Sequence, residues 1–254
     1  MKNRRSRVIA VGIGALMAVA ALPATAEVIV LSAKGSSLTA GQTLADTATI
    51  DLPAGATAEV LLPSGAMKNL TGPSKTPVRS LTGGAKPDTG LFNRVTELVS
   101  KPAGSESAVG AVRAARPVAQ PAKPMPFSWT SVPIDADGDF CVEKGATLAL
   151  VRGASDKPQR LTLVDVAAST RVEVSFEAGK PAAAWPDALA PKVGTYAVIV
   201  ADRPMKQLRL RLIAPLPDRS ETLRVLHGQR CDYQMRAFLQ ELTQVAAHGS
   251  AAKQ

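Results

Sequence analysis

Short apolar runs recur along the first part of the chain, between Glu27 and Pro73. Each run is bounded by Gly, Pro, Ser or Asp, which is typical of short strands joined by tight turns. In residues 56–62 the small or apolar side chains of Ala56, Ala58, Val60 and Leu62 alternate with Thr57, Glu59 and Leu61, so one face of that strand can pack inward. The pattern predicts a small β-meander over residues 27–77, and nothing in it indicates catalysis.

The pattern changes after this stretch. Residues 75–87 are polar and predict a loop. Apolar residues then recur at helical spacing and predict a short helix near 91–99; they are Leu91, Val95, Leu98 and Val99. Residues 100–126 are rich in Ala, Pro, Gly and Ser, which favours an extended linker. We therefore predict that residues 78–126 form a linker between two domains.

A second set of strands is predicted beyond residue 127. Apolar and polar positions alternate in several short segments separated by turn signals; the segments are 140–142, 147–152, 160–166, 171–176, 195–201 and 207–213. Strands at this spacing indicate a β-sandwich, of which the immunoglobulin-like fold is one form. No helix of crossover length separates them, so a parallel α/β sheet is disfavoured. This domain is predicted to cover residues 127–217.

The last segment, residues 218–248, has a helical pattern that Gly228 is expected to interrupt. Apolar residues mark one stripe of its second half: Cys231, Met235, Phe238, Leu242 and Val245. The simplest interpretation is that the stripe packs on the second domain; a groove for a partner is the alternative. The predicted fold class is therefore mainly β, with a β-meander, a linker with a short helix, and a β-sandwich-like domain with a C-terminal helix.

The first 26 residues indicate export. Basic residues at positions 2, 4, 5 and 7 precede an uncharged apolar stretch, residues 8–22, and Ala24-Thr25-Ala26 matches a cleavage site. We expect cleavage between Ala26 and Glu27 and a periplasmic location. The alternative is an uncleaved anchor, but the apolar stretch is shorter than the about 20 residues that a spanning helix needs. The Arg4-Arg5 pair leaves both the general secretory and the twin-arginine route open.

Removal of the signal would also remove four basic residues, so the formal charge would fall from +9 to +5. The remaining Lys and Arg residues are scattered, and aromatic residues are few. Nucleic-acid binding is therefore not expected, and no stable membrane span is expected after processing.

The two cysteines, Cys141 and Cys231, would both lie in an oxidising compartment. An even count in an exported chain predicts a disulfide between them, although two separate buried thiols would also satisfy the sequence. A zinc site is not expected, because only His227 and His248 could add ligands.

Asp135-Ala136-Asp137-Gly138-Asp139 resembles the start of a calcium-binding loop. The sixth position is Phe140 rather than Gly, and the twelfth is Ala146 rather than Glu, so the spacing does not fit. A hairpin turn at Asp137-Gly138 is the preferred interpretation.

No nucleophile elbow, phosphate-binding loop or dinucleotide fingerprint is present in the sequence. A pair of carboxylates for glycoside hydrolysis can lie far apart in a chain, so that possibility stays open. Trp129 and Trp185 could stack on sugars or fill the core, and scarce aromatic residues favour the core. We therefore predict no catalytic, cofactor-binding or metal-binding residues.

The first module resembles the FecR-like β domain of exported bacterial proteins. The resemblance rests on three short patterns: Leu38-x-x-Gly41-Gln42-x-Leu44, the run Thr49-Ile50-Asp51-Leu52-Pro53-x-Gly55, and Val60-Leu61-Leu62-x-x-Gly65 followed by Leu70. The wider layout also resembles exported proteins of Gram-negative bacteria; it includes Trp129, Cys141, Trp185-Pro186 and Cys231-x-x-Gln234. The resemblance implies a periplasmic interaction module.

The sequence therefore predicts a non-catalytic protein of the cell envelope, without a cofactor, that binds an envelope protein or a cell-wall glycan through the first module or the C-terminal helix. The alternatives are an envelope glycan hydrolase and a spacer whose linker sets the distance between two domains.

Overall fold

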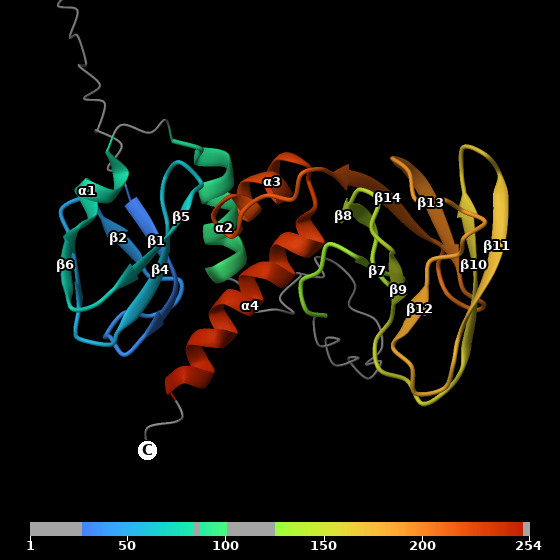
Figure 1. The fold of residues 1–254 in the computed structure, drawn as a ribbon, viewed down its shortest axis with the longest axis horizontal. Coiled ribbons are helices and arrows are strands. Elements are labelled where there is room, and N and C mark those ends of the chain that lie inside the picture. Colours follow the sequence, from blue (N-terminus) through green and yellow to red (C-terminus); the bar gives the residue numbers. More distant parts are fainter. Residues whose placement is uncertain (1–26, 84–86, 101–124, 251–254) are drawn as a thin grey trace, which may run out of the picture.

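The computed structural model describes residues 27–83, 87–100 and 125–250. The chain is mainly β, with two β-rich parts and a group of helices between them (Figure 1). The predicted fold class is confirmed. The predicted signal segment and most of the predicted linker lie outside the described residues.

The first β-rich part contains two small sheets. A four-stranded antiparallel sheet has the order β2-β1-β4-β5, formed by Thr43–Ala45, Glu27–Lys34, Thr57–Leu61 and Met67–Thr71. Strands β3 (Thr49–Leu52) and β6 (Ser74–Pro77) form the second sheet, and α1 (Val78–Thr82) follows. Val78 is buried in the core of this part, so its packing extends past the predicted limit at residue 77.

Strand β1 is buried on both faces, which explains its unbroken apolar run from residue 28 to 31. Val28 and Val30 pack in the core of the first β-rich part. Ile29 and Leu31 point the other way, into a second core that also contains residues of the helices and both cysteines. We call this cluster the central core. Successive side chains of β1 therefore still point to opposite faces of the sheet, but both faces are apolar.

The second β-rich part is a sandwich of two sheets. The five-stranded sheet has the order β11-β10-β13-β14-β8, formed by Thr170–Phe176, Gln159–Asp165, Gly194–Ile199, Lys206–Ile213 and Gly138–Glu143. The three-stranded sheet has the order β12-β9-β7, formed by Ala182–Ala184, Ala149–Val151 and Ser131–Pro133. Their inner faces share one core that includes Phe140, Leu163 and Tyr196.

Two strand pairs in the sandwich are parallel, β14 with β8 and β7 with β9. Immunoglobulin domains consist of antiparallel sheets, so this arrangement differs from theirs. The strands β7 and β8 follow each other in the chain but lie in different sheets. The predicted hairpin turn at Asp137-Gly138 is therefore wrong: the connection carries the chain from one layer of the sandwich to the other.

Helices occupy the space between the two β-rich parts (Figure 1). Helix α2 (Thr89–Ser100) begins after Asp88, whose carboxylate Oδ1 accepts a hydrogen bond from the Leu91 N–H at 3.0 Å. A short 3₁₀ turn, Arg219–Glu221, leads into α3 (Thr222–Gly228), and α4 covers Asp232–Ser250. Gly228 ends α3, as expected. In the described part of the chain no helix is long and apolar enough to cross a membrane.

The apolar stripe of α4 is shared by the two β-rich parts. Met235, Phe238 and Leu242 are buried in the central core, together with Ile29 of β1 and Ile213 of β14. The sequence predicted packing on the second domain alone; the contact with β1 is a finding of the structure. Because this stripe is already covered, it is not a free groove for a partner. The side chain of Val245 lies outside the described residues.

Candidate interaction surface

The disulfide predicted between Cys141 and Cys231 is present, with 5.8 Å between the Cα atoms. Cys141 lies in β8 and points to the outer face of the five-stranded sheet, and Cys231 directly precedes α4. Both residues are fully buried. The bond therefore fastens the start of α4 to the edge strand of the sandwich.

Gln234 closes the same edge with its side-chain amide. Its Oε1 accepts a hydrogen bond from the Cys141 N–H at 2.6 Å, and its Nε2 donates to the Cys141 carbonyl at 2.6 Å. Nε2 also donates to the Ser128 carbonyl at 2.8 Å. The side-chain amide pairs with the backbone of Cys141 as a neighbouring strand would, and it is almost completely buried. Sequence reasoning gave Gln234 no role of its own.

Three aspartates pair with basic residues of the neighbouring segment. Asp135 Oδ1 accepts from Arg203 at 3.0 Å, and Asp137 Oδ2 accepts from Lys206 Nζ at 2.8 Å. Asp139 accepts from Arg209 Nη2 at 2.8 Å and from Arg211 Nε at 2.9 Å. The alternating aspartates of the acidic motif thus match a basic ladder at β14, which explains the motif without calcium. The sequence contained a hint of this pairing, because Arg209 and Arg211 are two residues apart, like the aspartates of the motif.

These contacts set the protonation of the aspartates. Burial alone would raise the pKa of Asp139, but the hydrogen bonds from Arg209 and Arg211 outweigh it, and its pKa lies below the ordinary value of 3.8. The pKa of Asp137 is lowered in the same way, since Lys206 and the Gln207 N–H outweigh the effect of burial. Both groups therefore stay ionised and occupied by structural partners at neutral pH.

A further buried carboxylate lies at the end of β10. Asp165 Oδ1 accepts hydrogen bonds from the N–H groups of Ala167 and Ala168 at 3.0 and 3.1 Å, and Oδ2 pairs with Lys192 Nζ at 2.7 Å. The hydrogen bond from Lys192 and those from the backbone lower the pKa of Asp165. This carboxylate shapes the turn between β10 and β11.

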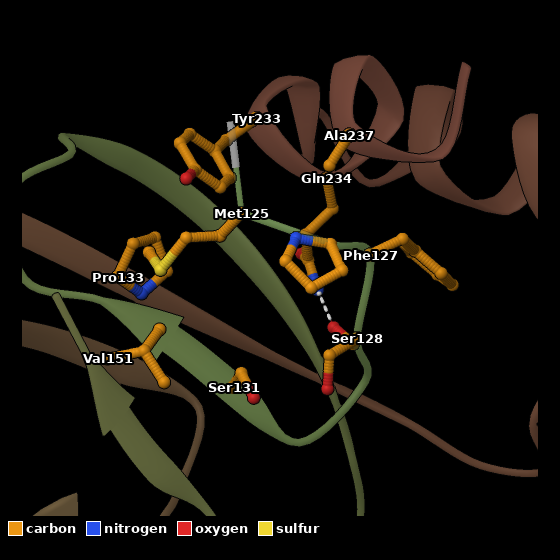
Figure 2. Close-up of a pocket in the computed structure, with 10 residues that line it drawn as sticks. Met125, Phe127, Ser128, Ser131, Pro133, Val151, Tyr233, Gln234 and Ala237 are labelled. Carbon is orange, nitrogen blue, oxygen red and sulfur yellow. Dashed lines mark hydrogen bonds between the residues drawn. The ribbon is translucent and has the colours of Figure 1, made fainter. Parts of the chain in front are cut away.

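A small pocket lies between β7 and α4 (Figure 2). It has a volume of about 100 Å³ and is lined mainly by apolar groups, among them Met125, Pro133 and Val151. Tyr233 and Gln234 of α4 lie across from Pro133 and Val151 in Figure 2, and Met125 lies beside Tyr233. Ligand pockets usually measure about 300–1,000 Å³. The lining residues include no carboxylate and no imidazole, so this pocket does not support the hydrolase alternative.

The tryptophans contribute to the cores. Trp185 is buried and its indole N–H donates to the Leu189 carbonyl, while its ring meets Tyr196 edge to face at 5.1 Å. Trp129 is partly buried against the central core and meets Phe127 at 5.0 Å. His227 lies in the last turn of α3, and the side chain of His248 lies outside the described residues. Among residues 27–83, 87–100 and 125–250, no group of three potential ligands is placed to hold a metal ion.

The outer face of the five-stranded sheet carries an apolar stripe along β10 and β13. Leu161 and Leu163 of β10, and Tyr196 and Val198 of β13, point into the sandwich core. The residues between them therefore face outward. We call these residues the β10–β13 stripe: Thr162, Val164, Val166, Thr195, Ala197 and Ile199.

Cross-strand pairing makes the stripe continuous. Thr162 lies opposite Ile199, and Val164 lies opposite Ala197. The Val166 N–H donates to the Thr195 carbonyl at 3.0 Å, which brings the last pair together. Val166 is 50% exposed and Ile199 is 40% exposed. Val193 and Met205, which directly precede β13 and β14, are also exposed, whereas Ala197 at the centre of the stripe is buried.

Charged side chains border the stripe on both sides. Arg171 and Glu173 lie on β11, and Arg209 and Arg211 lie on β14. Arg160 adds a further positive charge at the start of β10. The border therefore contains more arginines than acidic groups, even when the pairing of Asp139 with β14 is counted. The surface thus has an apolar centre and a cationic rim.

A scan against protein-family models, a search of curated proteins and a search of solved structures each found no match to this chain. The FecR-like resemblance of the first module accordingly stays a prediction.

Proposed function

We propose that this protein is a non-catalytic interaction module of the bacterial cell envelope, and that it contacts its partner through the β10–β13 stripe. The observation that carries the proposal is the pair of exposed aliphatic side chains at the two ends of this stripe, Val166 and Ile199, which are 50% and 40% exposed; between them Val164 is half-buried and Ala197 is buried. Exposed apolar side chains bordered by a polar rim are typical of protein interaction sites.

The chemistry of the face also indicates the kind of partner. Its centre offers aliphatic and threonine side chains, and its rim offers guanidinium groups of β11 and β14. A complementary partner is a protein with an apolar patch bordered by carboxylates, because opposite potentials favour encounter and fix orientation. This site differs from the two that the sequence suggested, the first module and the C-terminal helix.

The disulfide supports the compartment in this proposal. Structural disulfides persist in oxidising environments such as the periplasm, and both cysteines of this chain are used in one. Export through the signal at residues 1–26, with cleavage between Ala26 and Glu27, and a FecR-like character of the first module are parts of the same proposal.

Site-specific photo-crosslinking in intact cells tests the function. A photo-reactive amino acid would replace Ile199 in the stripe, Val166 near its other end, or Leu216, an exposed apolar residue outside the stripe (37% exposed). We expect positions 199 and 166 to capture the same envelope protein and position 216 not to capture it.

Two results would overturn the proposal. Equal capture from positions 199 and 216 would show that the stripe is not the contact surface. Absence of capture from the stripe, with the protein sedimenting with purified cell wall, would favour the glycan-binding alternative.

A further inference from the structure

The two edges of the five-stranded sheet differ. At the β8 edge the Cys141 backbone is paired with the Gln234 amide, and the Glu143 N–H donates to the Trp129 carbonyl at 2.9 Å. Native proteins commonly protect sheet edges by such coverage, since unpaired N–H and C=O groups attract other strands. The β8 edge is therefore closed within the chain.

The opposite edge, β11, is open. This strand has seven residues, Thr170–Phe176, without proline, and its pairing with β10 continues without a bulge. In the described part of the chain, no hydrogen bond from outside the β10 ladder reaches its backbone. Figure 1 shows β11 at the side of the sandwich away from the helices. A strand of this kind is a template for pairing with another chain.

The charges of β11 favour a second copy of the same strand. Arg171 and Glu173 are exposed on the outer face, two residues apart. In an antiparallel pair centred on Val172, Arg171 of each copy lies opposite Glu173 of the other, which forms two ion pairs. A pair centred on Glu173 would instead set two carboxylates directly opposite each other, and like charges in that position are destabilising.

We propose that β11 pairs antiparallel with β11 of a second copy, about a two-fold axis at Val172. Such an interface is isologous, so one strand supplies both halves and the assembly closes as a dimer. An axis perpendicular to the sheet keeps the outer faces of the two copies on one side. The two β10–β13 stripes would then belong to one continuous surface.

Sedimentation of the purified, processed protein over a range of concentrations tests the proposal. We expect a concentration-dependent dimer. Glu173→Arg and Arg171→Glu each place like charges opposite each other and should weaken dimerisation about tenfold, on the order of the energy of two cross-strand ion pairs. The double exchange R171E/E173R restores both pairs and should restore the dimer. Unchanged thermal unfolding of each variant, measured where the protein is monomeric, controls for folding.

Crosslinking through an added thiol tests the register. Val172→Cys lies on the proposed axis, opposite its own copy, so oxidation should link the two chains. Thr170→Cys lies opposite Val174 of the second copy and should not form a link to itself. The assay uses purified protein, so its result is independent of any envelope partner.

Several results would overturn the inference. A monomer at every concentration would do so, as would a dimer that the two single charge variants leave unchanged. Efficient crosslinking of T170C without crosslinking of V172C would exclude this register. A monomer that binds another protein's strand, with binding lost in Val172→Pro, would assign the edge to a different occupant.

Discussion

The two edges of the five-stranded sheet differ in how far they are covered by the rest of the chain. At the β8 end a disulfide, the Gln234 amide and the Asp139 ion pairs concentrate within a few residues, and α4 covers the outer face. At the β10–β11 end Val166 and Ile199 are exposed on the outer face, and within the described residues β11 pairs with β10 alone. Buried polar groups need hydrogen-bond partners within the protein, whereas exposed polar groups can form hydrogen bonds with water. The difference places the stabilising contacts at one end and the proposed recognition surface at the other.

Of the contacts at the β8 end, the disulfide should contribute most to the free energy of unfolding. It closes a loop with a sequence separation of 90 residues, for which the loop-entropy model gives about 4–5 kcal/mol at most. We expect Cys141→Ala with Cys231→Ala to lower the free energy of unfolding by about that amount, measured by urea denaturation. The reduced wild-type protein serves as the second comparison. A loss below about 1 kcal/mol would show that the central core holds α4 without the bond.

Removing the Gln234 amide should have the next largest effect. Gln234→Ala leaves the buried N–H and carbonyl of Cys141 without their partners, which costs about 1–3 kcal/mol. The matched control is Gln229→Ala, a change of the same kind at an exposed position. Equal unfolding free energies for the two variants would contradict the role of Gln234 in closing the β8 edge.

The Asp139 ion pairs should contribute less at neutral pH and give the β8 end an acid dependence. Because the pKa of Asp139 is lower in the folded state, its contribution is complete above the ordinary value of 3.8 and is lost as the pH falls through the folded-state pKa. Asp139→Asn should cost about 1 kcal/mol at pH 7, since both arginines are partly exposed, and less at pH 3. Urea denaturation at pH 7 and pH 3 measures the free energy of unfolding, with Asp187→Asn at an exposed position as control. An equal loss of stability at the two pH values would contradict the acid dependence.

Changes in the stripe should have the smallest effect on stability. Ile199→Asp alters a side chain that is 40% exposed, so the free energy of unfolding should change by no more than about 0.5 kcal/mol. Capture of the proposed envelope partner should nevertheless be lost, because the change adds a charge within the apolar stripe. Leu216→Asp is the matched control. A large loss of stability in I199D would show that the stripe belongs to the structural end of the sheet.

Local patterns were sufficient to predict most individual elements. Period-two alternation located β10, β11 and β14, and helical spacing located α2 and α4. The strands β7 and β12 were missed, and the predicted loop at residues 75–87 was wrong in its first half, which contains the end of β6 and all of α1. Composition and the signal-like first residues predicted the Cys141–Cys231 bond, since only two cysteines were available in a chain predicted to be exported.

The pairing of distant elements could not be predicted in this way. The parallel pairing of β8 with β14 gives Asp139 its arginines and leaves β11 at the other edge, and it depends on segments about 70 residues apart. Strand register is selected by packing over the whole sheet, which no local window contains. The sequence by itself therefore determined where most of the strands and helices lie along the chain, and which two cysteines form the disulfide. Only the tertiary structure decided that β1 has two buried faces, that α4 is shared by both β-rich parts, and that Val166 and Ile199 face solvent at the two ends of the β10–β13 stripe.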